Sequence, residues 1–282
     1  MKIMNKKEHL KDVNKYYVTS KLGYNFFLWG SKHFGYYPKN KSIFERKAQV
    51  LMQDLVAEKL KLSSKDKVLD AGCGQGVVGT YLAKKYHVNI KGITVVPFEV
   101  EKANKLSIIK NVKKIARFYL MDYNDIKFNK NSFDCIYCME SLSHSLNIKK
   151  TFQELYRVLK KNGRIAVFDY ELSEENNFST SEKEVLSKII KGSAMYGLSK
   201  QRTGVFYQTL KEVGFKNINV EDITENLEPS LKRLYRFSFI SYYLFVKPFK
   251  LQTKYPNIAA AVEFYNQAKK GLIKYKILTA TK

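Results

Sequence analysis

Short β-branched segments alternate with helical segments from residue 67 to residue 224. In such a chain each strand is followed by a crossover helix that packs back onto the sheet, so the fold is expected to be α/β with a doubly wound sheet. The helix at 148–161 is expected to end at the C-cap pair Asn162-Gly163. The predicted strands are 67–72, 89–94, 116–122, 133–140, 163–172, 217–224 and 271–282, and the other predicted helices are 77–86, 98–110 and 208–215.

Two segments depart from this alternation. Residues 1–66 are predicted to form an N-terminal helical segment, and residues 67–282 the core. Within the core, residues 173–207 form a polar excursion, and residues at about 228–270 form a helical insertion rich in aromatic side chains before the last strand.

The charge of the chain is strongly positive. The formal net charge is +24, which attracts anionic partners. Only seven of the 50 basic residues are arginine, so 43 are lysine. Because recognition of phosphates and bases favours the planar guanidinium, this composition disfavours nucleic acid and favours a solvated basic surface, with contact to an anionic membrane left open. The sequence does not fix an oligomeric state.

The cysteine content and the hydropathy of the chain limit the cellular compartment in which it is expected to work. Three cysteines cannot form a secreted disulfide framework, so reduced thiols and a cytoplasmic setting are expected. The longest apolar stretch, 237–246, is too short to span a bilayer. Cys135 and Cys138 lie three apart on a predicted strand and therefore point to opposite faces, so they are expected to pack in the core, and no metal is predicted.

The motif VLDAGCGQGVVGTYLA at 68–83 predicts a ligand site. Gly72, Gly74 and Gly76 follow a strand and precede a helix, where glycine lets the backbone approach a ligand and the helix N-terminus offers N–H groups. The spacing also satisfies the dinucleotide fingerprint G-x-G-x-x-G. Against a dinucleotide, the second strand ends without an acidic residue to bind a ribose. Asp70 favours a ligand that carries an ammonium group.

These features resemble the class I S-adenosylmethionine-dependent methyltransferases, and the resemblance implies a Rossmann-like, seven-stranded sheet. DAGCGQG resembles their first motif, which implies that Asp70 and the three glycines surround the methionine moiety of S-adenosyl-L-methionine. GITVVPFEVEKAN at 92–104 resembles the G-I-T-x-S-x-x-Q motif of cyclopropane-lipid, sterol and tocopherol methyltransferases. It implies that Thr94 and Glu99 lie near the ribose or the methionine tail, with Glu99 where those enzymes usually have Gln.

The segment MDYND at 121–125 is similar to the adenine-binding motif of the same family. The resemblance implies that Asp122 accepts a hydrogen bond from the adenine amino group and that the backbone N–H of Tyr123 meets the ring. The alternative for Asp122 is a plain cap at the end of a strand.

Three further segments narrow the resemblance to tocopherol and sterol C-methyltransferases and to natural-product methyltransferases. They are WGSKHFGYY at 29–37, MESLSH at 139–144 and EDITENLEPS at 221–230. The resemblance implies a small, lipophilic or amphipathic acceptor of the sterol, tocopherol, quinone or polyketide type, methylated on carbon or oxygen. An RNA methyltransferase and a cofactor-binding protein without methyl transfer remain as alternatives.

Three residues are candidates for the chemistry. A hydroxyl or acidic carbon needs a base to take its proton, and His144, after the fourth strand, is the first candidate. Asp169, at the end of the fifth strand, is expected either to orient His144 or to be the base. Glu140 is expected to line the methyl-donor end of the pocket, with an N-cap role as the alternative.

The N-terminal segment is expected to cover the cofactor site as a lid. His33 and Tyr37 are the residues predicted to close it, and Trp29 belongs either to the lid or to ordinary core. The aromatic stripe at 228–249 is expected to form a wall of the acceptor pocket, with simple core packing as the alternative.

Overall fold

The computed structural model describes residues 5–28, 30–39 and 41–282, so Trp29 lies outside the described residues. A seven-stranded sheet with the order β3-β2-β1-β4-β5-β7-β6 forms the centre, and β7 runs antiparallel to both of its neighbours. The predicted doubly wound α/β fold is therefore confirmed. The strands are β1 (Lys67–Ala71), β2 (Asn89–Thr94), β3 (Ala116–Leu120), β4 (Phe133–Met139), β5 (Leu159–Leu172), β6 (Lys216–Asp222) and β7 (Ile273–Thr281).

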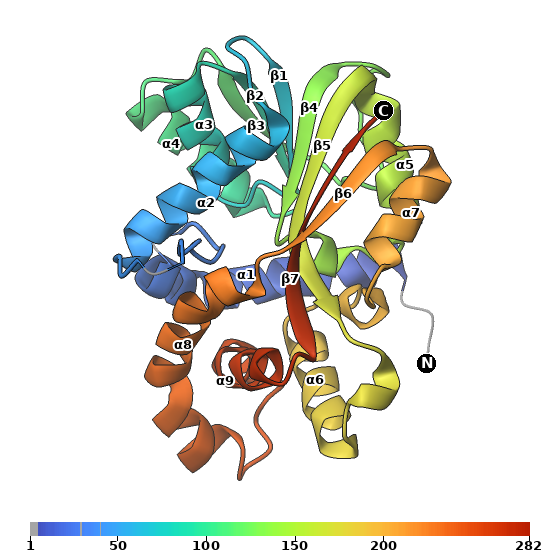
Figure 1. The fold of residues 1–282 in the computed structure, drawn as a ribbon. Helices are drawn as coiled ribbons and strands as arrows, with labels where there is room; N and C mark the ends of the chain where they lie inside the picture. The colour runs from blue at the N-terminus through green and yellow to red at the C-terminus, as the bar shows by residue number, and fades with distance from the viewer. Residues whose placement is uncertain (1–4, 29, 40) are drawn as a thin grey trace.

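Helices cover both faces of this sheet, as Figure 1 shows. One face packs against α2 (Glu45–Leu60), α3 (Val77–Tyr86) and α4 (Pro97–Ile109), and the other against α5 (Ile148–Val158) and α7 (Val205–Val213). Cys135 lies in the first of these cores and Cys138 in the second, so the two thiols point to opposite faces as predicted. Burial on both faces explains the near-continuous apolar strands.

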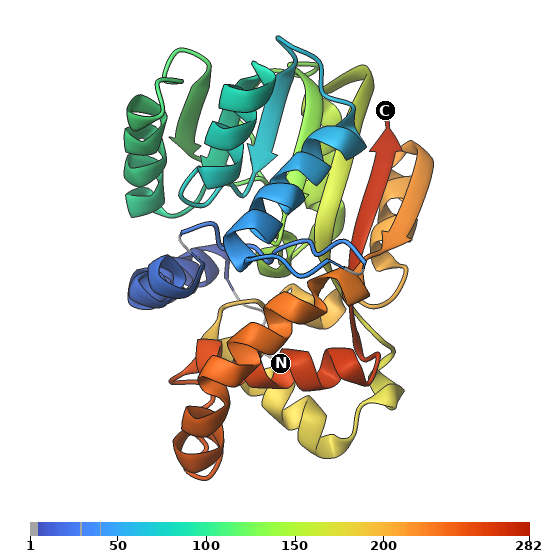
Figure 2. The same ribbon diagram turned by 60° about the vertical axis from the view of Figure 1, so that its left-hand side comes forward.

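A second group of helices lies beyond the carboxyl ends of the parallel strands. Figures 1 and 2 show α1 (Lys6–Leu28) crossing beneath that edge of the sheet. Below it lie α6 (Thr180–Gly192), α8 (Thr224–Ser241) and α9 (Pro256–Lys269), with a π-helical turn at Tyr242–Val246 after α8. Among the residues that the structure describes, three short 3₁₀ turns lie at Leu142–His144, Glu175–Asn177 and Leu198–Lys200.

The boundary between α5 and β5 differs from the prediction. The helix ends at Val158, not at residue 161, and Asn162 and Gly163 lie inside β5. Leu159 pairs with Phe133, and the register then shifts before Arg164 pairs with Cys135. Asn162 takes a positive φ of 61° in this irregularity and donates its N–H to the carbonyl of Lys282. Pairing with neighbouring strands therefore ends the helix earlier than its local sequence suggests.

Candidate active site

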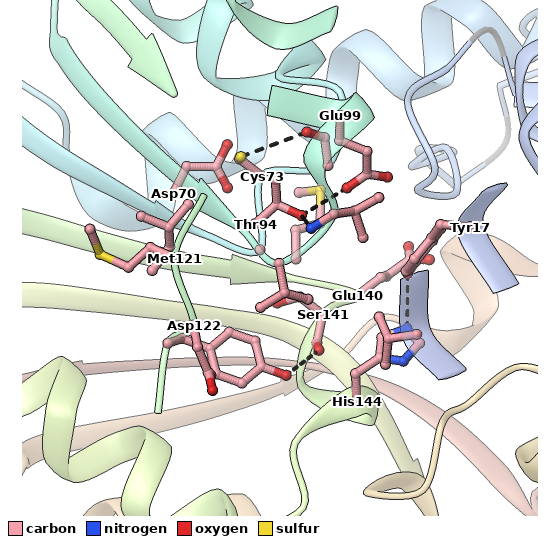
Figure 3. A pocket seen from close by; sticks show the side chains of 18 of the residues that line it. Tyr17, Asp70, Cys73, Thr94, Glu99, Met121, Asp122, Glu140, Ser141 and His144 are labelled. Atoms are coloured by element: carbon pink, nitrogen blue, oxygen red, sulfur yellow. Dashed lines mark hydrogen bonds between the residues drawn. The ribbon is translucent and has the colours of Figure 1, made fainter. Parts of the chain in front are cut away.

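A cavity opens at the carboxyl ends of β1, β2 and β4, and α1 closes one side of it (Figure 3). Side chains from segments far apart in the sequence line the cavity. The predicted residues among them are Asp70, Gly72, Gly74, Thr94, Glu99, Asp122, Tyr123, Glu140, His144 and His33.

The turn between β1 and α3 depends on glycine for two different reasons. Gly72 has a φ of 100°, and a Cβ there would lie 2.3 Å from the Cβ of Ser141, so only glycine fits between the ends of β1 and β4. Gly76, by contrast, does not line the cavity. A Cβ on it would lie 2.6 Å from the Cβ of Ala103 and 2.9 Å from Cζ of Phe118, so Gly76 serves the packing of α3 against α4 and β3.

Asp70 places a buried carboxylate at the base of this turn. Its Oδ2 makes no hydrogen bond of normal geometry within the described residues. Burial raises the pKa of Asp70 to about 7, and the neighbouring Tyr137 hydroxyl counteracts part of that rise. A buried carboxylate oxygen without a partner is costly, so this position favours a cationic group on a ligand.

The first turn of α4 carries an ion pair that the sequence analysis did not anticipate. Glu99, 2% exposed, pairs with Lys32 and accepts a hydrogen bond of 2.8 Å from the Thr94 hydroxyl. The Lys32 ammonium lies 3.9 Å from the centroid of the Tyr17 ring. Burial lowers the pKa of Lys32, and the carboxylate of Glu99 opposes that change. The N-terminal segment is thus tied to α4 at the cavity by a buried charge pair.

Asp122 and Tyr123 border the cavity after β3. Asp122 Oδ1 accepts the backbone N–H of Asn124 at 2.8 Å, which is the capping geometry, and its Oδ2 pairs with Lys6 at 3.0 Å. The Tyr123 hydroxyl donates to the carbonyl of Ser141 at 3.1 Å. The carboxylate therefore caps its turn with one oxygen and leaves the other for an exposed lysine from α1.

Glu140 holds the loop after α1 against the sheet. It has a φ of 49° and accepts hydrogen bonds from the Phe34 N–H at 3.0 Å, the Tyr170 hydroxyl at 2.7 Å and the Tyr275 hydroxyl at 3.1 Å. Burial raises the pKa of Glu140 to about 8, and these donors counteract that rise. The N-cap alternative is wrong, because Ser141 occupies the N-cap position of the following 3₁₀ turn and the Asn147 side chain caps α5.

His144 is held from two sides. Its Nδ1 lies 3.0 Å from the carbonyl oxygen of Ala194, and its Nε2 lies 2.8 Å from the Tyr17 hydroxyl. Because a carbonyl only accepts hydrogen bonds, Nδ1 carries the proton, so Nε2 accepts from Tyr17. His9, also on α1, lies with its Nε2 2.7 Å from the carbonyl oxygen of His144. Burial lowers the pKa of His144 to about 4, so the ring is neutral.

Asp169 does not reach the cavity. Its side chain is fully buried, its Oδ2 accepts the Leu142 N–H at 2.8 Å and its Oδ1 accepts the Tyr170 N–H at 2.9 Å. These bonds fix the turn that carries His144. The expectation that Asp169 contacts His144 or acts as the base is therefore not met by the geometry.

His33 and Tyr37 fix the loop after α1 through hydrogen bonds within the protein. His33 donates from Nδ1 to the carbonyl of Phe34 at 2.9 Å and accepts at Nε2 from the Gln53 amide at 3.2 Å. Both nitrogens are used, and burial lowers its pKa to about 4. Tyr37 donates to Glu45 at 3.0 Å and is not among the cavity-lining residues, so the expectation that it closes the cofactor site is wrong.

Comparison with known proteins decides the family. Residues 62–230, more than half of the chain, match the family model described as a methyltransferase domain. The chain belongs to the methyltransferase-domain family. It is an S-adenosyl-L-methionine-dependent methyltransferase, and the predicted family, reaction class and cofactor are confirmed.

Curated relatives differ in how much of their length is shared. A Diels-Alderase of Talaromyces variabilis described as S-adenosyl-L-methionine-dependent is 29% identical, covering 90% of this chain and 89% of the relative. The 27-O-demethylrifamycin SV methyltransferase of Amycolatopsis mediterranei is 29% identical, covering 72% and 73%. The sterol 24-C-methyltransferase of Schizosaccharomyces pombe is 24% identical over 79% of this chain, which spans only 58% of that relative.

Solved structures share the fold across the whole chain. The cyclopropane synthase MmaA2 from Mycobacterium tuberculosis superposes with a TM-score of 0.81 at 16% identity, covering 100% of both chains. The [4+2]-cyclase SpnF superposes with a TM-score of 0.77 at 23% identity, covering 97% of this chain and 96% of that one. At these identities the likeness establishes the fold alone.

The cavity of this methyltransferase fits its cofactor. The unpartnered Oδ2 of Asp70 suits the ammonium of the methionine moiety, and the backbone at Gly72 and Gly74 leaves room that a Cβ would reduce. The negative charge of Asp122 lies after β3, where the family resemblance puts the adenine. When bound, S-adenosyl-L-methionine supplies an electrophilic methyl group on a sulfonium.

Tyr17 and Lys32 are among the residues of this methyltransferase site that escaped the sequence analysis. Tyr17 and Lys32 both come from the segment expected to be a lid, and both touch predicted site residues. A signal was present for Tyr17, since His9, Tyr17 and Tyr24 follow one another at spacings of eight and seven residues along one helix face. Lys32 lies inside the WGSKHFGYY motif, at a position where the motif fixes no residue type.

Proposed function

We propose that this methyltransferase acts on a small lipophilic or amphipathic acceptor, of the sterol or polyketide type, and methylates oxygen or carbon. The observation that carries the proposal is the make-up of the cavity. Its lining combines the charged turn at Asp70, the apolar side chains Leu10 and Val13 of α1, and the polar side chains of His144 and Tyr17. The named acceptors of two relatives, a sterol and a rifamycin, are of the same chemical kind.

The proton of the acceptor is assigned to the Tyr17–His144 pair. With S-adenosyl-L-methionine bound, its methyl group would pass to a hydroxyl acceptor, which must then lose its proton. The acceptor proton passes to the Tyr17 oxygen while the Tyr17 proton passes to Nε2 of His144, 2.8 Å away. The imidazolium of His144 that results still donates its Nδ1 proton to the carbonyl of Ala194, and this hydrogen bond holds the ring in place.

The N-terminal helix is assigned the role of a lid. Three contacts tie α1 and the loop after it to the cavity: Tyr17 and His9 with His144, and Lys32 with Glu99. Because these contacts lie across the cavity, the acceptor enters only when α1 moves, and closure excludes water from the reacting atoms. A cytoplasmic setting is proposed from the three cysteines, which are buried and free.

The experiment that tests this function follows the methyl group. The purified protein is incubated with methyl-labelled S-adenosyl-L-methionine and an extract of its source cells, and the label is partitioned between organic, aqueous and nucleic-acid fractions. Label in the organic fraction is expected and identifies the acceptor. Label in nucleic acid contradicts the proposal and returns attention to the +24 charge.

A second candidate reaction of the same site is a cycloaddition. Two observations favour it. The relative that covers 90% of this chain is named a Diels-Alderase, and within the described residues both ring nitrogens of His144 already have hydrogen-bond partners. A [4+2] cycloaddition forms two carbon–carbon bonds and needs no base. Consumption of an acceptor without formation of S-adenosylhomocysteine distinguishes it from methyl transfer.

A further inference from the structure

The end of α8 and the turn after it carry an exposed apolar cluster. We call it the tip patch, and it consists of Phe237, Phe239, Ile240, Leu244, Phe245 and Phe249. Each of these side chains is 41% to 68% exposed. Figures 1 and 2 show this segment projecting away from the sheet at the lower end of the molecule. Exposed apolar side chains gathered in one segment in this way mark an interaction site.

The π-helical turn that carries part of the patch is anchored in the core. Tyr242 and Val246, in the same π-helical turn as Leu244 and Phe245, are buried at 0% and 2% exposure. The Tyr242 hydroxyl donates to Glu263 on α9, and the Leu251 N–H donates to the carbonyl of Val246 at 2.8 Å. The outward apolar side chains therefore belong to a turn whose other side is anchored in the core.

Within the sequence segment that carries the patch, the charged side chains are all basic. From residue 229 to residue 262 there is no aspartate or glutamate. The same stretch holds six basic residues, of which five are exposed: Lys232, Arg236, Lys247, Lys250 and Lys254. Phenylalanine and leucine side chains flanked by such groups match what inserts at the boundary between acyl chains and anionic headgroups.

We infer that the tip patch docks this enzyme on an anionic lipid bilayer. The exposed basic residues around the tip patch form its charged rim. A second copy of the chain fits the patch less well, because two rims of the same charge would face each other. Nucleic acid fits less well, because its phosphates would face the rim but leave the apolar centre uncovered. Within the described residues no helix is long and apolar enough to cross a bilayer, so the attachment is peripheral. The inference goes beyond the proposed reaction and does not depend on it.

Vesicle co-sedimentation of the full chain tests the charged rim. The protein is expected to bind vesicles that contain phosphatidylglycerol, more weakly as salt is added, and to bind pure phosphatidylcholine vesicles poorly. The double variant K247E/K250E should bind the anionic vesicles about twenty-fold more weakly or worse, since each basic residue near such a surface contributes about five-fold. The control K113E/K114E changes two exposed lysines before β3, on the opposite side of the molecule, and produces the same net charge.

The apolar centre is tested separately. F245S/F249S should weaken binding about ten-fold or more, while I108S/I109S, which removes two exposed isoleucines at the end of α4, should not. Thermal melting of all variants checks that they fold. Equal binding to both vesicle types, or equal losses in the patch and control variants, would overturn the inference. So would a wild-type dimer that F245S/F249S converts to a monomer without lipid, because the patch would then be a self-association face.

Discussion

Replacing Tyr17 by phenylalanine separates a chemical role of its hydroxyl from a structural one. The hydroxyl donates to Nε2 of His144 at 2.8 Å, and Nδ1 is committed to the carbonyl of Ala194. Without Tyr17 the buried Nε2 loses its donor, which costs about 1–3 kcal/mol of folding free energy. If the acceptor proton passes through this hydroxyl, Tyr17→Phe also lowers kcat by about 10²- to 10⁴-fold.

A matched control lies one residue away. The Tyr16 hydroxyl is also buried on α1 and bonds to Tyr24 at 2.7 Å and to Asn257, but it does not line the cavity. Tyr16→Phe should therefore lose a comparable folding free energy in urea unfolding and keep its turnover. Turnover is measured as S-adenosylhomocysteine formed with the acceptor recovered from the organic fraction.

The pair also makes a prediction about additivity. If Tyr17 and His144 act in one proton path, the double variant Y17F/H144Q loses no more turnover than the worse single variant. The folded pKa of His144 is about 4, below its ordinary value of 6.5, so the base is unprotonated at neutral pH and activity is lost as the pH falls toward 4. A Tyr17→Phe enzyme within three-fold of wild type, or one matched by Tyr16→Phe, would refute the proton path.

Three further changes test the buried carboxylate of Asp70, the packing at Gly76 and the buried ion pair of Lys32 with Glu99. Asp70→Asn should lower cofactor affinity about ten- to hundred-fold in calorimetric titration; because burial raises the pKa of Asp70 to about 7, wild-type affinity should fall as the pH drops below 7, and the variant should lack that dependence. Gly76→Ala should lose about 2–4 kcal/mol in urea unfolding, since its φ is 75° and its Cβ would clash with Phe118; full stability would contradict this packing argument. Lys32→Met should cost about 3–5 kcal/mol by leaving Glu99 buried and unpaired, and adding Glu99→Gln should restore most of it; no restoration would show that the pair is not the cause.

The sheet could be predicted from the sequence because its signals are local. A β-branched run followed by a helical pattern specifies strand, crossover and parallel neighbour without reference to the rest of the chain. The direction of β7 and its place between β5 and β6 have no such signal, since strand periodicity is the same in either direction. The early end of α5 is missed for a related reason, because it is set by the pairing of Leu159 with Phe133 across the sheet.

The cavity residues also divide into those whose position follows from local sequence and those whose position depends on distant segments. Asp70, Thr94 and His144 lie at or just beyond the carboxyl ends of strands, and parallel strands bring those ends to one edge, so their convergence follows from the topology. Asp169 also lies on β5 near that edge, but its side chain turns to backbone N–H groups. Which way a side chain points at a strand end depends on the neighbouring loop, and local sequence does not contain that information.

The assignment of the base shows how much rests on distant segments. His144 is the base expected from the sequence, yet its protonation state is set by the carbonyl of Ala194 after α6 and by the hydroxyl of Tyr17 on α1. Neither contact follows from the motif that contains His144. Because the carbonyl fixes the proton on Nδ1, the lone pair of Nε2 faces α1, and an acceptor reaches it only through Tyr17 or after α1 has moved. The position of α1 and access to the base are therefore coupled. A substitution that loosens α1 should change turnover even where the substituted residue contacts neither the cofactor nor the acceptor.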